Sequence, residues 1–490
     1  MSWSRRSFLR AALVGSPALL AAQGVGRVLA AMSSGPRERA MGYGPLRPDP
    51  DGLLDLPEGF RYRLLSTGVI DAERNTDARF ASLLSDGSPT PGLHDGMACF
   101  PGPEGLTILV RNHELNPGDG PMVDARRERP YDPMTGGGTT TLWLDPERRL
   151  VACFASLSGT LRNCAGGRTP WGSWLSAEEI TLVPGAHDAV NGDRTPDVSR
   201  RHGYIFEVDS RSTGLVEPLP LKGMGRFRHE AAAVDPETGF AYLTEDTEDG
   251  LLYRFRPEVV LRGKDPSDLR VGDYAHGGVL EALRVKDRPQ LITRNLNLRR
   301  AISLGESLPV DWVRIDEPDP DMDLARRLGE PILMHAAPTS TRAQGFARGC
   351  AQFARSEGIV YANGSVYICC TLGGPKTLGQ VFRIDLREQR LSLLVESDDE
   401  SLLDGPDNIC ASPYGDLVVC EDNLSLGKRE NYIVGVTPQG RCYRIARNAH
   451  PRKREFAGAC FSPDGRTMFV NVQNPGLTFA IWGPWSARRV

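Results

Sequence analysis

A repeated pattern, a turn followed by a short strand, most constrains what this chain can fold into. In each copy, a turn rich in Pro, Asn, Asp and Gly precedes a run of about five apolar residues, and polar or acidic residues follow. The apolar runs are enriched in β-branched and aromatic residues, as strands are. The turns of the four clear copies and of a looser fifth copy lie at 235–239, 363–364, 412–415, 462–465 and 101–105.

The copies predict an all-β domain, and their unequal spacing favours a β-propeller with insertions and short helices. Average globular composition over 490 residues, with 53 Gly and 37 Pro, excludes a disordered, collagen-like or coiled-coil chain. The largest insertion is expected at about 250–345, with a helix-like patch at 322–328. A net charge of −4 indicates neither a nucleic acid nor a membrane surface as a partner.

The N-terminus has the features of an export signal. Arg5 and Arg6 precede a modest apolar stretch, and the small residues around Ala30 offer a cleavage site. This pattern is typical of twin-arginine signals, so we expect residues 1–30 to be removed and residues 31–490 to form one domain. No later stretch has the ~20 apolar residues of a membrane span. We therefore expect a periplasmic or secreted protein that meets the twin-arginine translocase during export.

Acidic residues end several of the predicted strands. The sixth residue after the turn glycine is Glu245, Cys370, Glu421 and Asn471 in the four clear copies, and the looser copy ends in Glu114. Equivalent strand ends of a propeller meet at the central channel, where carboxylates repel one another unless a multivalent cation neutralises them. One such cluster alone is typical of a solvated turn, but several at equivalent positions favour a metal site.

Four further turns carry carboxylates near the predicted strands, and one of them also carries a cysteine, Cys164. Oxygen ligands suit hard cations, whereas a thiolate suits iron or another transition metal. A mixed-metal centre is therefore a candidate. The first turn contains Cys164 and leads to Glu179, the second contains Glu230, the third contains Glu357, and the fourth contains Asp407 with Asn408.

Several of these segments together resemble the PhoX family of exported alkaline phosphatases. The most specific is NCAGGRTPWGSWLSAEE, which begins at Asn163, and FRHEAAAVDPETGFAYLTEDT, GPDNICASPYGDLVVCEDN and EFAGACFSPDGRTMFVNVQNPG are also typical. The resemblance runs from about Gly52 to Trp485. It implies a six-bladed propeller whose central site holds a pair of Fe³⁺ ions and several Ca²⁺ ions joined by an oxo bridge.

The resemblance also implies roles for individual residues. Cys164, Glu179 and Glu245 match the iron ligands of the family. Further metal ligands are expected at Glu114, Glu230, Glu357, Asp407, Asn408 and Glu421. The turn at Glu455 could add a calcium ligand.

Hydrolysis of a small phosphomonoester fits such a centre. Clustered cations neutralise the charge that the transition state spreads over the phosphoryl oxygens, and our hypothesis is that a metal-bridging oxygen attacks phosphorus. Arg162, Arg168 and Arg355 adjoin expected ligands and could hold phosphate oxygens bidentately. We expect a monomer, with Cys164, Glu179, Glu245, Arg162 and Arg168 as the catalytic residues.

Two other functions fit the same strand ends. A calcium-dependent lactonase on a propeller also uses acidic and Asn ligands, but it needs no cysteine. A non-catalytic exported propeller would hold calcium only for stability.

Overall fold

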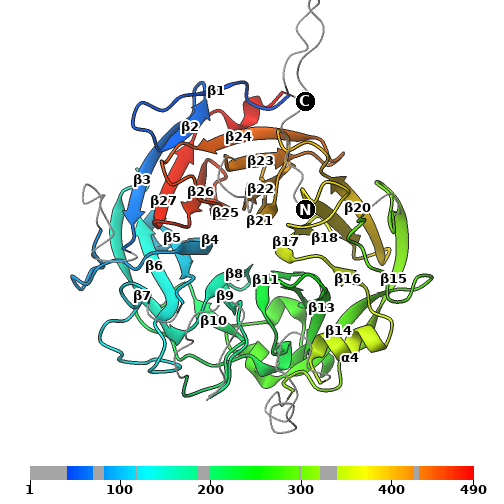
Figure 1. Cartoon of the computed structure of the whole chain (residues 1–490). Helices are drawn as coiled ribbons and strands as arrows, with labels where there is room; N and C mark the ends of the chain where they lie inside the picture. The colour runs from blue at the N-terminus through cyan, green and yellow to red at the C-terminus, as the bar shows by residue number, and fades with distance from the viewer. Residues whose placement is uncertain are drawn as a thin grey trace, which may run out of the picture.

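The structure, a computed structural model, describes residues 41–69, 82–116, 119–184, 198–296, 300–320, 339–422 and 430–489. Antiparallel sheets surround a central axis, as Figure 1 shows, and within these ranges the helices are few and short. The expected all-β, propeller-like fold is confirmed. The predicted export signal and the helix-like patch at 322–328 lie outside the described residues.

Hydrogen bonds join the described strands into five sheets. The first contains β4 (His94–Pro101), β5 (Thr107–His113), β6 (Gly137–Leu144) and β7 (Leu150–Thr160). The second contains β8 (Asn163–Arg168), β9 (Ser173–Glu178) and β10 (Ile205–Asp209). The third and largest contains β11 (His229–Val234), β12 (Ala241–Glu245), β13 (Gly250–Pro257), β14 (Gly278–Val285), β15 (Ser307–Arg314), β16 (Gln352–Phe353), β17 (Ser356–Ala362), β18 (Ser365–Cys370), β19 (Gln380–Asp385) and β20 (Arg390–Glu396).

The last two sheets include the N-terminal strands. One contains β1 (Leu46–Arg47), β2 (Leu54–Pro57), β21 (Pro406–Ala411), β22 (Leu417–Glu421), β23 (Tyr432–Val436) and β24 (Cys442–Asn448). The other contains β3 (Arg61–Thr67), β25 (Phe456–Phe461), β26 (Thr467–Val472) and β27 (Leu477–Trp482).

The count of five sheets differs from the expected six separate blades. Strand β15 pairs with β14 on one side and with β20 on the other, so two groups of strands join into one large sheet. Facing the axis are β4, β8, β11, β17, β21 and β25, each beside the next, and β25 lies beside β4. This ring of inner strands positions the site described below.

The two ends of the described chain close the ring. Strand β3 pairs with β27 near the C-terminus, with Arg61 opposite Trp482. Behind this pair, the Trp485 ring packs edge-on against Phe60 with ring centroids 4.7 Å apart, and Tyr43 and Phe461 also contact it. Such aromatic pairs stabilise beyond their buried area by about 0.5–1.5 kcal/mol each. The closure therefore joins residues that the sequence places at opposite ends.

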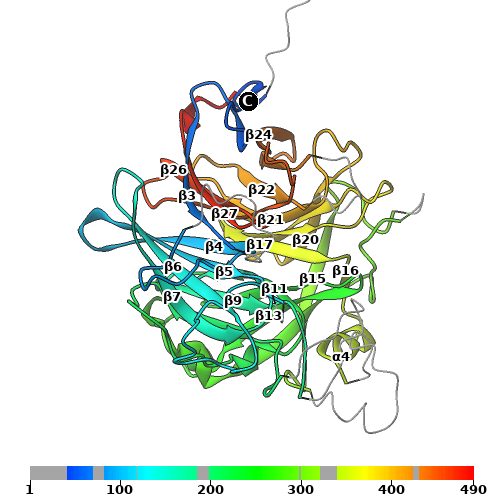
Figure 2. The same cartoon turned by 60° about the vertical axis from the view of Figure 1, so that its left-hand side comes forward.

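The expected insertion at 250–345 contributes β13, β14 and β15 to the largest sheet, together with short helices. These are α2 (Glu258–Leu261), α4 (Thr341–Ala347), η3 (Pro266–Asp268) and η4 (Asp273–His276). Helix α4 packs on β13 and lies outside the ring of sheets in both views (Figures 1 and 2). In the described part of the chain, no helix combines the length and the apolar character of a membrane span.

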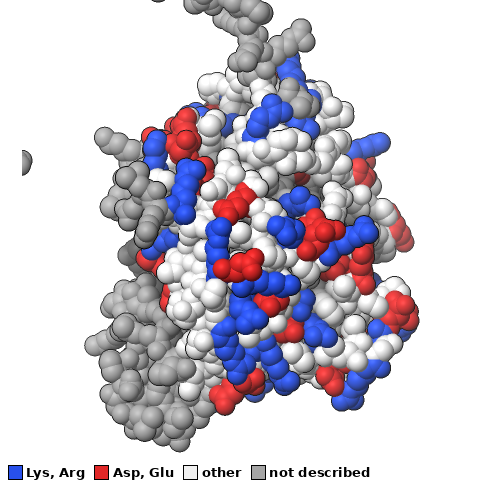
Figure 3. All heavy atoms as spheres, turned by 90° about the vertical axis from the view of Figure 1, so that its right-hand side faces the viewer, with Lys and Arg blue, Asp and Glu red and all other residues white. Residues whose placement is uncertain are grey.

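Positive and negative side chains are intermixed on the face shown in Figure 3. On the outer strands β14 and β15, the guanidinium of Arg284 pairs with Asp311 at 2.7 Å. This face therefore carries no field of a single sign.

All ten cysteines lie among the described residues, and none is disulfide-bonded.

Candidate metal centre

Each inner strand carries a β-bulge where two of its residues face one residue of the next strand. In β11, for example, His229 pairs with Glu245 and Ala232 with Leu243, so that Glu230 and Ala231 share one partner. A bulge turns a side chain out of the regular alternation of a strand, and bulges are frequent next to active sites. The first residues of the first five bulges, called the bulge residues, are Asp95, Cys164, Glu230, Glu357 and Asp407.

The sixth bulge begins with Gly458. Its φ of +61° favours glycine, and a Cβ atom there would lie 2.4 Å from the backbone oxygen of Asp95. Five of the six inner strands therefore present a metal-ligating side chain at one structurally equivalent position.

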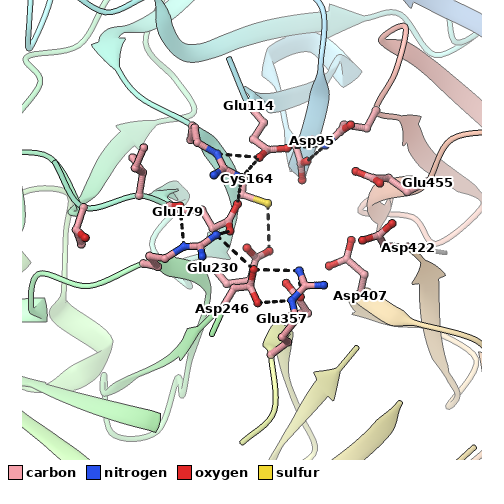
Figure 4. Close-up of a pocket in the computed structure, with 16 residues that line it drawn as sticks. Asp95, Glu114, Cys164, Glu179, Glu230, Asp246, Glu357, Asp407, Asp422 and Glu455 are labelled. Atoms are coloured by element: carbon pink, nitrogen blue, oxygen red, sulfur yellow. Dashed lines mark hydrogen bonds and ion pairs between the residues drawn. The ribbon is translucent and has the colours of Figure 1, made fainter. Parts of the chain in front are cut away.

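A second set of acidic residues directly follows the neighbouring strands β5, β9, β12 and β22. These strand-end residues are Glu114, Glu179, Asp246 and Asp422. They line one cavity together with the bulge residues and Glu455. In Figure 4 the two sets converge from all sides of the channel.

The cavity has a volume of about 280 Å³ and is strongly acidic. Among the described residues, nine carboxyl groups line it, with the Cys164 thiol and three guanidinium groups. All of these carboxylates except Glu455 and Asp422 are less than a tenth exposed, and Glu230 is fully buried. Buried carboxylates in such excess are unfavourable unless cations neutralise them.

Burial raises the pKa of several of these groups, and neighbouring carboxylates raise it further. The pKa values of five carboxyl groups are well above their ordinary range: Asp95, Glu230, Glu357, Asp407 and Glu455. Burial raises the pKa of Glu179 to about 7, although Arg162 and Arg228 act to lower it. Burial also raises the pKa of the Cys164 thiol, and Asp95 and Glu230 act in the same direction.

The donor set fits multivalent cations. Three groups of side chains each bring their ligand atoms within 4.8 Å of one another: Asp95–Glu114–Cys164, Cys164–Glu179–Glu230 and Glu230–Glu357–Asp407. The Sγ atom of Cys164 belongs to two groups and lies 3.4 Å from Oε1 of Glu230. Two buried oxygens, Oδ1 of Asp95 and Oε2 of Glu230, accept no hydrogen bond from any residue that the structure describes. Such oxygens are suitable cation ligands.

Three arginines compensate part of this charge. Arg162 donates to Oε1 of Glu114 at 2.9 Å and to Oε2 of Glu179 at 2.8 Å. Arg228 donates to the other oxygen of Glu179. Arg355 binds both carboxylate oxygens of Asp246, at 2.8 and 3.0 Å. Burial would raise the pKa of Asp246, but Arg355 and Arg228 hold it below its ordinary range.

Two of these arginines have left-handed backbones, with φ of +46° at Arg162 and +51° at Arg355. This conformation is uncommon for residues other than glycine and is found preferentially at functional sites.

Most of the residues expected from the sequence lie in the cavity. They are Glu114, Cys164, Glu179, Glu230, Glu357, Asp407, Glu455, Arg162 and Arg355. Four others, Glu245, Glu421, Asn408 and Arg168, do not line it.

Glu245 and Glu421 differ from expectation because they hold the backbone of the next strand. Glu245 accepts hydrogen bonds from the amide of Leu251 at 3.1 Å and from the hydroxyl of Tyr253 at 3.0 Å. Glu421 likewise accepts from the amides of Asp404 and Tyr432, both at 2.9 Å. The cavity is lined instead by the residues directly after them, Asp246 and Asp422.

Asn408 and Arg168 also have other contacts. Asn408 donates to Oδ1 of Asp407 at 3.2 Å and accepts from the amide of Gly458 at 2.9 Å, so it supports a bulge residue. The guanidinium of Arg168 lies 5.3 Å from the centre of the Phe100 ring. Both residues line a separate cavity of about 630 Å³.

The sequence analysis missed Asp95, Asp246, Asp422, Arg228 and Gln473 among the cavity residues. A signal for two of them was present, because counting seven residues rather than six from the turn glycine reaches Asp246 and Asp422. His94 with Asp95 also repeats the order of His229 with Glu230, both pairs lying at a bulge.

A buried network of charged side chains supports the end of β9, next to Glu179. Its neighbour Glu178 accepts a hydrogen bond from His202 at 2.7 Å, and Asp132 contacts the other ring nitrogen at 3.3 Å. All three side chains are fully buried. Although burial acts to lower it, the two carboxylates raise the pKa of His202 to about 9. His202 is therefore a buried cation at neutral pH.

This network predicts a pH-dependent share of stability. A histidine whose pKa is higher in the folded than in the unfolded state stabilises fully below about pH 6.5, and this contribution is lost as the pH rises through about 9. Wild type should therefore be more stable than His202→Gln at pH 6. The difference between their unfolding free energies should be about 3 kcal/mol larger at pH 6 than at pH 9.5. Urea titrations at both pH values test this. A difference that does not change with pH would contradict it, and His276→Gln on η4 is the control.

Known proteins resemble this chain in sequence family and in fold. The family described as alkaline phosphatase PhoX matches residues 41–476. The solved structure of Pseudomonas fluorescens PhoX in complex with vanadate, a transition state analogue, aligns with a TM-score of 0.62 at 17 % identity. The alignment covers 91 % of this chain and 98 % of that chain. At this identity the structural likeness establishes the fold.

Two other solved structures are more distant. A gluconolactonase from Xanthomonas campestris aligns with a TM-score of 0.36 at 12 % identity, over 91 % of this chain and 99 % of that one. A putative TolB from Agrobacterium tumefaciens aligns with a TM-score of 0.35 at 10 % identity, over 81 % and 91 %. No curated protein sequence matches the chain significantly. Because the family match spans most of the sequence, including every residue of the acidic cavity, this chain belongs to the alkaline phosphatase PhoX family.

Proposed function

We propose that this phosphatase hydrolyses small phosphomonoesters in the acidic cavity, with a pair of Fe³⁺ ions and several Ca²⁺ ions bound there. One observation carries the proposal. Nine carboxyl groups, one thiol and three arginines from the inner ring of strands converge on a single cavity within the matched family region. The carboxylates alone would repel a phosphate dianion, so the proposal places cations beside the three arginines.

The donor types suggest which residues hold which cation. The two groups that share Cys164 combine a thiol with carboxylates and suit the iron pair. The third group, Glu230–Glu357–Asp407, offers only oxygen and suits calcium. When bound, these ions would supply positive charge for the phosphoryl oxygens and activate the attacking oxygen.

The residues of this chain orient both the cations and the substrate. Thr371 donates to Oε1 of Glu357 at 2.8 Å, and Gln473 donates to Oε2 of Glu114 at 2.5 Å, so both carboxylates have fixed orientations. Such supporting hydrogen bonds tune ligand geometry. Arg162, Arg228 and Arg355 present planar N–H groups that bind the non-bridging phosphoryl oxygens and remain charged at alkaline pH. Burial of the cavity walls excludes competing water from these contacts.

Three further points belong to this proposal. The ring of six inner strands supports a six-bladed description in which β15 joins two blades.

Arg5 and Arg6 support export by the twin-arginine translocase to the periplasm or beyond, after the metals have bound in the cytosol. We also propose that the protein acts as a monomer, because a closed ring is complete in one chain.

Protein expressed from the full-length sequence, exported and processed by the cell and then purified, tests the function directly. We expect release of p-nitrophenol from p-nitrophenyl phosphate at alkaline pH in the presence of Ca²⁺, and no hydrolysis of gluconolactone. Elemental analysis of the same sample should find iron and calcium. Glu230→Gln, which alters two of the three ligand groups, should lose both the metals and the activity. Lactone hydrolysis without phosphatase activity, or calcium without any hydrolysis, would contradict the proposal.

A further inference from the structure

The three cavity arginines occupy equivalent positions on neighbouring inner strands. Arg162, Arg228 and Arg355 each lie two residues before a bulge residue, at β8, β11 and β17. The corresponding residues before Asp95 and Asp407 are Leu93 and Gly405. The positive groups therefore gather on the side of the cavity that Glu179 and Asp246 occupy in Figure 4.

Asp246 differs from the other acidic groups on this side. It belongs to none of the three ligand groups found among the described residues, whereas all five bulge residues do. Both of its oxygens are bound by Arg355 through Nε and Nη2, and Nη2 of Arg228 lies 3.7 Å from Oδ2. Its carboxylate is thus the common counterion of two arginines.

The backbone ties the same three residues together. The amide of Asp246 donates to the carbonyl of Arg228 at 3.2 Å, and the amide of Arg355 donates to the carbonyl of Thr247 at 2.8 Å. From the outer side, Arg342 of α4 donates to Oγ1 of Thr247 at 2.5 Å and to Oδ1 of Asp249 at 2.6 Å. The loop at 246–249 is therefore fixed on both sides.

We infer that Asp246 is a positioning residue, which holds the guanidinium groups of Arg228 and Arg355 toward the phosphoryl group, and not a metal ligand. The inference rests on the proposed function. A carboxylate that binds the Nε–Nη2 edge of an arginine fixes the plane of the guanidinium. Nη2 of Arg355 also lies 3.0 Å from Oε1 of Glu357, so Nη1 is the group that Arg355 presents to a second oxyanion. Substituting Asp246 should therefore weaken phosphate binding without removing metal.

The test compares wild type with Asp246→Asn in two measurements. Elemental analysis should give the same iron and calcium per chain, and calorimetric titration with inorganic phosphate should give a Kd about tenfold higher, as expected for a weakened charged hydrogen bond. In an Arg355→Ala background, Asp246→Asn should raise the Kd less than about twofold, since it acts through that arginine. Loss of metal in Asp246→Asn, or fully additive effects, would overturn the inference.

Two further measurements keep the inference testable. If Asp246→Asn does not fold, Arg355→Lys takes its place, because lysine keeps the charge but cannot bind Asp246 through two parallel N–H groups. Full metal content with weakened phosphate binding supports the inference, and unchanged binding overturns it. A wild-type protein that neither binds phosphate nor hydrolyses p-nitrophenyl phosphate would overturn the proposed function, whereas an active wild type with metal-depleted Asp246→Asn would overturn the inference alone.

Discussion

Cys164→Ala should abolish iron binding and lower phosphatase activity by at least about a thousandfold, because the thiol belongs to two of the three ligand groups. Each of those groups would keep only two carboxylates. Carboxylates bind calcium well but offer no soft ligand for a transition metal. We therefore expect the variant to lose any colour due to ferric thiolate while it keeps part of its calcium.

Metal analysis, the visible spectrum and hydrolysis of p-nitrophenyl phosphate measure these effects in one preparation. Cys442→Ala is the matched control, since it removes a partly buried thiol from β24, outside the cavity. The control should retain iron and activity. An iron-containing, active Cys164→Ala protein would show that the thiol is not a ligand. A colourless wild type with calcium as its sole metal would remove the mixed-metal proposal itself.

The all-β fold could be predicted from the sequence because its signals are local. A turn such as Ser412–Gly415 and the apolar run after it specify a strand wherever they occur. The joining of two blades through β15 could not be predicted in this way. It depends on the pairing of β15 with β20, in which Ser307 lies opposite Ser392, and these residues are far apart in the chain.

The residues predicted as metal ligands line the cavity where one acidic residue or cysteine stands alone at an inner strand. Cys164 and Glu357 are examples, and both are bulge residues. Where two acidic residues are adjacent, the sequence could not decide which one faces the cavity. Neighbouring side chains in a strand point in opposite directions, so an offset of one residue exchanges the two roles.

The adjacent pairs follow one rule in the structure. The first acid of the pair binds backbone amides of neighbouring segments, as Glu178 does with the amides of Leu161 and Gly203. The second acid lines the cavity, as Glu179 does. The same division separates Glu245 from Asp246. Position in the strand, and not residue type, therefore decides which carboxylate lines the cavity.

Removal of the metals should abolish activity and also destabilise the protein. Without cations, nine carboxyl groups share one largely buried cavity with three arginines. Cations that bind only the folded state stabilise it by mass action, so we expect chelation with EDTA to lower the Tm by on the order of 10 °C. Differential scanning calorimetry before and after chelation measures the shift, and added Ca²⁺ and Fe³⁺ should reverse it.

The metal-free protein should also respond to pH in a defined direction. Burial raises the pKa of Glu179 to about 7, above its value in the unfolded chain, so the folded state binds the proton more tightly. Stability due to such a carboxyl group is present at low pH and is lost as the pH rises from about 4.5 to about 7. The Tm of the metal-free protein should therefore fall across this range, whereas bound cations should largely remove the dependence.

Glu230→Gln separates electrostatic repulsion from a general loss of packing. Glu230 is fully buried, its pKa is raised by burial and by Glu357, and its Oε2 atom accepts no hydrogen bond from the described part of the chain. Glutamine keeps the shape but carries no charge, so at pH 8 the variant should melt above metal-free wild type and below metal-loaded wild type. Glu217→Gln, an exposed substitution on the outer surface, should change neither Tm. If Glu230→Gln melted below wild type both with and without metal, the carboxylate would stabilise the protein through packing. Repulsion between the carboxylates would then not destabilise the metal-free protein.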